Sequence, residues 1–225
     1  ADGRVRVLPR PERPARGRGR GQRRPAAPAD PALREVIIEH AAGREFRVDA
    51  GGFWQVHRLA AHTLTTVVAE ALEGIDIDPD AAHLDLYGGV GLFAATIADA
   101  GGTRVTSVES DPRATEHAGE NLAEWLGARA ETSRVDRWLG RVVADASAAE
   151  RERLARGVVV LDPPRSGAGI DVARDIAALH PAAVVYVACD PVALARDLGV
   201  FAEHGYRTDA VRGIDLYPNS HHVEA

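Results

Sequence analysis

The sequence predicts an α/β fold: a Rossmann-like, doubly wound and mostly parallel sheet, preceded by a low-complexity basic arm. Beyond residue 80, short apolar runs alternate with segments of helical periodicity. Such alternation is typical of a parallel sheet covered by helices on both faces. The apolar runs at 158–162 and 183–189 are continuous rather than alternating, which indicates strands that are buried on both faces.

The predicted elements follow one another in a regular order. Before the alternating part, strands are expected at 34–39 and 45–48, and a helix is expected at 55–72, where apolar residues recur every three or four positions. Further strands are predicted at 82–87, 104–109, 158–162, 183–189 and 206–216, with helices up to 100 and at 111–126, 171–179 and 192–203. The pattern at 128–156 is mixed and predicts no definite element.

Charge is unevenly distributed along the chain. Residues 1–30 hold nine arginines and three acids, a net charge of +6, whereas the remainder holds 18 basic and 30 acidic residues, a net charge of −12. The Arg/Pro/Gly-rich arm has too few apolar residues to form a core. A basic arm on an acidic body suggests a nucleic-acid contact through phosphates; a solvated linker is the alternative.

Composition excludes several classes of protein. There is no run of 18 apolar residues, so no transmembrane helix is expected, and the N-terminal segment lacks the apolar centre of a secretory signal. A single cysteine excludes an internal disulfide framework and fits a reducing, cytoplasmic setting. The chain contains no methionine, which indicates a piece of a longer protein, and we expect a monomer.

The residues that end the predicted strands are the most informative, because ligands of such sheets bind outside the carboxyl ends of the strands. The first run ends in Asp85-Leu86-Tyr87-Gly88-Gly89-Val90-Gly91, whose glycines let the backbone approach a ligand closely. Glu109 ends the next run, at a spacing that suits the hydroxyls of a ribose. Together they predict a cofactor that carries a nucleoside. A nicotinamide-dependent oxidoreductase, or an ordinary tight turn, remains an alternative.

Two later strand ends carry polar or reactive groups. The third reads Asp162-Pro163-Pro164-Arg165, a carboxylate followed by a stiff loop; a plain strand-ending turn is the alternative. The fourth ends in Cys189, just before Asp190-Pro191. A cysteine in an apolar strand is usually a small buried hydrophobe. At the end of a strand and before a helix, however, the helix dipole favours a thiolate, so we predict a reactive cysteine.

These segments, in this order, resemble the RNA uridine-C5 methyltransferases, class I enzymes that use S-adenosylmethionine to make 5-methyluridine in transfer and ribosomal RNA. The resemblance covers residues 52–224. The matching segments are Phe53-Trp54-Gln55-Val56-His57, 85–93, Asp162-Pro163-Pro164-Arg165-Ser166-Gly167, Cys189-Asp190-Pro191 with 195–198, and His221-His222-Val223-Glu224.

The resemblance implies a role for each matching residue. Cys189 would add to carbon 6 of the uridine as a nucleophile, and Glu224 would remove the proton from carbon 5. Phe53 and Arg165 would contact the RNA substrate. The residues implied in binding S-adenosylmethionine are Gln55, Tyr87, Gly89, Gly91, Glu109 and Asp162. The chain would divide into an arm or linker at 1–31, a remnant of a preceding β subdomain at 32–54, and a Rossmann-like methyltransferase catalytic domain at 55–225.

The sequence also departs from the family. Members usually carry an N-terminal β-barrel domain that binds RNA, and some hold an iron–sulfur cluster; one cysteine cannot support such a cluster. His221, His222 and Glu224 lack a further metal ligand at a suitable spacing, so we expect no metal. The family continues past Glu224 into a strand, so we expect a loosely held base here. The adenine contact is not assigned, with 133–136 as a candidate, and a non-catalytic RNA-binding fragment is a further alternative.

Overall fold

The structure is a computed structural model that describes residues 31–219 and 223–225. The basic arm, His221 and His222 lie outside the described residues. A short 3₁₀ helix, η1 (Pro31–Arg34), leads into an antiparallel hairpin of β1 (Val36–Ala41) and β2 (Arg44–Asp49). Helix α1 (Ala60–Glu73) then connects the hairpin to a larger sheet. Within the described ranges, no helix has the length and apolar character needed to cross a bilayer.

The larger sheet has five strands, all parallel, in the order β5-β4-β3-β6-β7. The strands are β3 (His83–Leu86), β4 (Val105–Glu109), β5 (Arg129–Thr132), β6 (Val158–Leu161) and β7 (Ala183–Tyr186). The chain winds outward from β3 to β5 on one side and from β6 to β7 on the other. The winding therefore reverses between β3 and β6, where such sheets bind ligands. The predicted doubly wound fold is confirmed.

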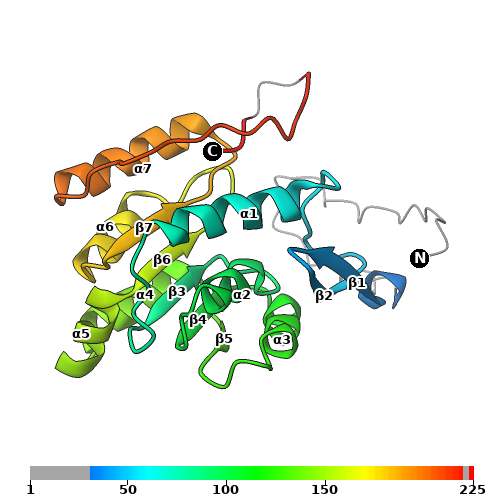
Figure 1. Ribbon diagram of the computed structural model, residues 1–225, viewed down its shortest axis with the longest axis horizontal. Coiled ribbons are helices and arrows are strands. Elements are labelled where there is room, and N and C mark those ends of the chain that lie inside the picture. The colour runs from blue at the N-terminus through cyan, green and yellow to red at the C-terminus, as the bar shows by residue number, and fades with distance from the viewer. Residues whose placement is uncertain (1–30, 220–222) are drawn as a thin grey trace, which may run out of the picture.

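Helices cover both faces of this sheet (Figure 1). The remaining helices are α2 (Leu92–Asp99), α3 (Pro112–Asn121), α4 (Val135–Asp145), α5 (Ala148–Arg156), α6 (Ile170–Ala178) and α7 (Pro191–Glu203). Val158 and Val160 of β6 pack with α1 and α2, whereas Val159 and Leu161 pack with α4, α6 and α7. Because both faces of the strand are buried, every position is apolar, which explains the continuous apolar run in the sequence.

Asp85 supplies a cap that α2 lacks. The N-cap of α2 is Gly91, which has no side chain to accept a hydrogen bond. The fully buried Asp85 of β3 instead accepts from the backbone N–H of Ala94 (3.0 Å) and from the Ser107 hydroxyl (3.1 Å). Its second oxygen, Oδ1, has no hydrogen-bond partner among the described residues. Burial raises the pKa of Asp85 to about 7.

One predicted helix begins later than expected, and one predicted strand is wrong. The helix expected at 55–72 begins only at Ala60, because the preceding residues do not bury an apolar face: Val56 is 85% exposed. The strand expected at 206–216 does not form. Apart from a single bridge between Ile214 and Glu224, this segment has no strand to pair with, and it runs back along α7 as coil (Figure 1). The region whose pattern was mixed, 128–156, contains β5, α4 and α5.

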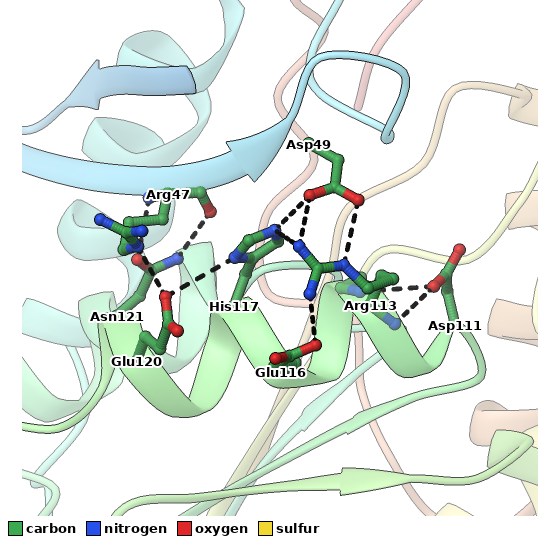
Figure 2. Close-up of polar contacts among 9 residues, drawn as sticks. Arg47, Asp49, Asp111, Arg113, Glu116, His117, Glu120 and Asn121 are labelled. Atoms are coloured by element: carbon green, nitrogen blue, oxygen red, sulfur yellow. Dashed lines mark hydrogen bonds and ion pairs between the residues drawn. The ribbon is translucent and has the colours of Figure 1, made fainter. Parts of the chain in front are cut away.

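A polar network attaches the end of the hairpin to α3 (Figure 2). The Asp49 carboxylate, which ends β2, accepts from Nε (3.1 Å) and Nη2 (2.8 Å) of Arg113 and from Nε2 of His117 (2.7 Å). Asp49 and His117 are both buried. Hydrogen bonds to charged groups are strong where water is excluded. The network therefore fixes the point from which the chain crosses to Gln55.

The rest of the hairpin is held by similar contacts. The Asn121 side chain accepts from the backbone N–H of Arg47 (2.9 Å) and donates to its carbonyl (3.2 Å), as a neighbouring strand would. The Arg44 guanidinium pairs with Asp99 and lies 4.3 Å above the ring of Trp125. The hairpin is thus bound to the helices of the larger sheet. The domain boundaries at 31/32 and 54/55 remain a prediction.

Replacing Asp49 with Asn is expected to loosen the hairpin. The hydrogen bonds from Arg113 and His117, opposed by burial, lower the pKa of Asp49 to about 2. A lowered pKa stabilises the fold above pH 4, and this contribution is lost as the pH falls toward 2. Asp49→Asn should lower the free energy of unfolding by about 1–2 kcal/mol at pH 7 and by about half of that near pH 3, measured by urea unfolding.

The matched control is Glu116→Gln, which removes an exposed partner of the same arginine. Its effect should stay below about 0.5 kcal/mol, because exposed ion pairs contribute little. Equal effects of the two substitutions would show that Asp49 does not hold the hairpin.

Replacing Asp85 with Asn is expected to make stability less sensitive to pH. Because the pKa of Asp85 is raised in the fold, the folded chain keeps a proton that the unfolded chain loses from about pH 4 upward, and stability falls as the pH rises through 7. Asparagine keeps an acceptor oxygen and cannot ionise. Between pH 5 and 8, the variant should therefore gain about 2–3 kcal/mol relative to the wild type in urea unfolding.

Asp171→Asn serves as the control, because that side chain is 91% exposed. Its free energy of unfolding should change with pH in parallel with that of the wild type. A parallel curve for Asp85→Asn as well would rule out a buried proton at Asp85.

Candidate active site

A cavity of about 1210 Å³ lies at the carboxyl ends of the parallel strands. Nine of the ten residues predicted for the site line it: Phe53, Gln55, Tyr87, Gly89, Glu109, Asp162, Arg165, Cys189 and Glu224. The exception is Gly91, whose contact with the cofactor stays a prediction. It turns the chain into α2 with a left-handed φ of +88°, and a Cβ there would come within 3.3 Å of Leu122.

The loop after β3 has an unusual backbone. Tyr87 and Gly89 have left-handed φ values of +63° and +54°, and a tyrosine rarely adopts this conformation outside functional sites. Gly88 between them cannot be replaced without displacement, because a Cβ would collide with the Ser107 hydroxyl and with Asp85. The absence of a side chain at Gly88 lets the loop lie close over the ends of β3 and β4.

Glu109 is brought to this loop, as the spacing predicts. Its Oε2 accepts from the backbone N–H of Gly89 (3.1 Å), twenty residues earlier in the chain. Its Oε1 accepts from the backbone N–H of Asp111 (2.8 Å) and from Ser110. These bonds hold the carboxylate at the cavity wall, and Oε2 retains a lone pair for a hydroxyl donor.

Gln55 and Asp162 meet across the cavity although 107 residues separate them. The Gln55 side-chain amide donates to Oδ2 of Asp162 at 3.4 Å. Burial, together with the nearby carboxylates of Glu224 and Asp85 and opposed by the bond from Gln55, raises the pKa of Asp162 to about 7. Asp162 therefore carries a proton for part of the time near neutral pH.

Cys189 does not end a strand, contrary to prediction. Strand β7 ends at Tyr186, and the last bond of the ladder joins Val187 to the carbonyl of Leu161. Beyond that point β6 offers no further partner, and the backbone of Ala188 instead pairs with Ala225 through two hydrogen bonds of 2.7 and 2.8 Å. Cys189 follows in the loop that leads into α7.

The prediction that the helix dipole favours a thiolate is also wrong. The N-cap of α7 is Asp190, whose carboxylate accepts the N–H groups that begin the helix, so these do not reach Cys189. Burial raises the pKa of Cys189, and the carboxylates of Glu224 and Asp162 raise it further, whereas the backbone N–H of Cys189 itself and, less strongly, Arg165 lower it. At rest the group is therefore the thiol.

Glu224 reaches the cavity from the opposite end of the chain. Its backbone exchanges two hydrogen bonds with Ile214 (2.7 and 3.1 Å), and the next residue, Ala225, pairs with Ala188 beside the cysteine. The side chain is 3% exposed, and burial raises its pKa. The expectation of a loosely held base is therefore not met, since the backbone is bonded on both sides.

The cavity lining includes part of the segment that was a candidate for the adenine contact, and one residue that sequence reasoning missed. Arg134, Val135 and Asp136 follow β5 and line the cavity, so the candidate segment 133–136 lies there in part. The sequence pattern at 128–156 is mixed and does not predict β5, the strand that ends just before these residues. Tyr217 lines the cavity as well, and no motif marks it. Within the described ranges, no three metal-binding side chains are grouped.

Curated relatives cover much of the chain, although no family model matches it. A protein of Streptomyces avermitilis named "Uncharacterized RNA methyltransferase" is 44% identical over 194 residues, which are 85% of this chain and 42% of that protein. A similarly named protein of Bifidobacterium longum is 42% identical over 200 residues, with coverages of 85% and 44%. The chain thus spans about two fifths of the length of these relatives.

Among solved structures, the tRNA (uracil-54, C5)-methyltransferase of Pyrococcus abyssi, in complex with S-adenosyl-L-homocysteine, superposes with a TM-score of 0.65. It is 26% identical, and the match covers 84% of this chain and 43% of that one. The fold is therefore that of the class I methyltransferases, as predicted, and over most of its length the chain is similar in sequence to bacterial proteins named RNA methyltransferases.

Proposed function

We propose that this chain is the catalytic part of an RNA methyltransferase that uses S-adenosylmethionine to methylate carbon 5 of a uridine. One observation carries the proposal: a cysteine and a carboxylate from distant segments, Cys189 and Glu224, line one cavity with Glu109 and Asp162, and the residues next to them, Ala188 and Ala225, pair through their backbones. The names of the relatives support RNA as the substrate, and the similarity to the tRNA (uracil-54, C5)-methyltransferase of Pyrococcus abyssi supports a uracil.

The residues at the strand ends fit S-adenosylmethionine. Because Gly88 has no side chain, the loop lies close to the ends of β3 and β4 and leaves room for a nucleoside above them. Glu109 is fixed where it can accept hydrogen bonds from ribose hydroxyls. Asp162 and Gln55, across the cavity, offer an acidic group and an amide for the amino-acid end of the molecule. When bound, S-adenosylmethionine would supply a methyl group activated by its positive sulfur.

Carbon 5 of uracil is a weak nucleophile and must be activated. In the proposed reaction the sulfur of Cys189, after losing its proton, bonds to carbon 6. The electrons of the 5,6 double bond move into an enolate, which places electron density on carbon 5. After carbon 5 is methylated, Glu224 accepts the carbon-5 proton, the double bond returns, and the sulfur leaves. A nucleophile and a base are both needed, and both line the cavity.

The mouth of the cavity offers contacts for RNA. Phe53 lines the cavity although its side chain is 71% exposed, so its ring is free to stack on a base. Arg165 lines it too, and its guanidinium can bond to phosphate or to a base edge. We also propose that the basic arm at 1–31 adds a contact to RNA phosphates without reading sequence.

Ligand binding separates this proposal from a nicotinamide-dependent enzyme. S-adenosylhomocysteine should bind and NADH should not, measured by isothermal titration calorimetry. Glu109→Gln should weaken S-adenosylhomocysteine binding by about 10- to 100-fold, because charged hydrogen bonds to the ribose are lost. Glu150→Gln, an exposed acid on α5, should bind as the wild type does. Binding of NADH alone would overturn the proposal.

The covalent step is tested with the only cysteine of the chain. Cys189→Ala should abolish methyl transfer to uridine-containing RNA, and RNA with 5-fluorouridine should form an adduct with the wild type that mass spectrometry places on Cys189. Glu224→Gln should accumulate a methylated adduct on ordinary RNA and turn over about 100-fold more slowly or worse, because the carbon-5 proton stays in place. Unchanged methyl transfer by Cys189→Ala would rule out the covalent mechanism.

A further inference from the structure

We propose that Asp197 is a positioning residue of this site: by holding the loop at 163–169 against α7, it fixes Arg165 at the wall of the cavity that Cys189 also lines. The proposal rests on Cys189 as the nucleophile, and hence on the proposed function. Asp197 is not among the residues that line the cavity, so it acts through the loop rather than on the substrate. It lies seven residues after Asp190, the N-cap of α7, and this spacing places both on one face of the helix.

The Asp197 carboxylate is fully buried and receives hydrogen bonds at both oxygens. Oδ2 accepts from the backbone N–H groups of Ala168 (2.9 Å) and Gly169 (3.2 Å) and from the Tyr186 hydroxyl (2.7 Å). Oδ1 pairs with Nε (2.8 Å) and Nη2 (2.7 Å) of Arg196. Charged groups with so many partners in a water-free setting are held in one position. Asp197 thus joins the loop, β7 and α7.

The path of the loop is fitted to this carboxylate. Nη2 of Arg196 also donates to the carbonyl of Ser166 (2.8 Å), and the N–H of Gly167 closes a turn onto the carbonyl of Pro164 (2.7 Å). Gly167 has a left-handed φ of +75°, and a Cβ there would come within 2.6 Å of both Oδ2 of Asp197 and Nη2 of Arg196. The loop therefore packs directly against the ion pair of Asp197 and Arg196, and this contact fixes the distance between the loop and α7.

Arg165 stands in the middle of this loop and acts on the cysteine. Arg165 and Cys189 line the same cavity. At that place the positive charge of Arg165 opposes the carboxylates of Glu224 and Asp162, although it is the weakest of the influences on the pKa of the thiol. Tyr217 also faces this group of charges. Because the attraction between charges depends on their separation, Arg165 is effective only while the loop keeps its place. Helix α7 therefore begins directly after Cys189. Through Asp197, the same helix also holds the loop that carries Arg165.

The experiment measures the rate at which iodoacetamide alkylates the single cysteine, as a function of pH, in the full chain. We expect Asp197→Asn to move the midpoint of the profile to higher pH, with a rate about threefold lower near pH 7.5 and an unchanged plateau at high pH. Arg165→Gln should give the same shift. The double variant should shift no further than either single one, because both substitutions remove the same interaction.

Simple loosening of the structure predicts a different result. It would expose the half-buried thiol, which raises the plateau rate and moves the midpoint to lower pH, because burial is the main cause that raises the pKa of Cys189. That result, an unchanged profile, or an Asp197→Asn shift that is fully additive to that of Arg165→Gln, would overturn the proposal. Asp171→Asn, which removes one exposed carboxylate from α6, is the matched control and should behave as the wild type does.

If Asp197→Asn fails to fold by circular dichroism, Tyr186→Phe and Arg196→Gln each remove one partner of the carboxylate and decide the matter. Both should shift the midpoint in the same direction by a smaller amount, and unshifted midpoints in both would overturn the proposal. Alkylation requires neither RNA nor S-adenosylmethionine. If the proposed function were wrong, Cys189→Ala would still transfer methyl groups, and this is measured in a separate assay.

Discussion

The parallel arrangement of the five strands is the constraint on which the site depends. Parallel strands end at one edge, so the side chains that follow four of them are delivered to one cavity without any of them being adjacent in sequence. The segments at these strand ends add a glycine loop, the carboxylates of Glu109 and Asp162, and the thiol of Cys189. The reversal of winding between β3 and β6 opens the space that these groups surround.

Much of this arrangement could be predicted because its signals are local. Continuous apolar runs mark strands buried on both faces, and the residue that follows such a run must lie at the sheet edge. That reasoning placed Glu109, Asp162 and Cys189 in one site, and all three line the cavity. Likewise Asp190 and Pro191 mark the start of a helix, which begins there.

What could not be predicted depends on contacts between distant segments. Ala188 pairs with Ala225 rather than with β6, and no local pattern announces which backbone a strand end will meet. The thiol state of Cys189 follows mainly from burial and from two carboxylates in other parts of the chain, which no local pattern indicates. Asp197 likewise stands in the sequence as one acid in a helix, whereas its partners come from a loop about thirty residues earlier.

The proton on Asp162 gives the cavity a property beyond shape. Its carboxyl has a pKa of about 7 because it is buried near other acids. A cation that settles beside it favours the ionised form, so arrival of the positive ligand is linked to departure of a proton. The cavity then changes its net charge by less than the charge of the ligand. The buried Asp162 at the end of β6 thus lets the site accept a cation without holding an ionised carboxylate when the cation is absent.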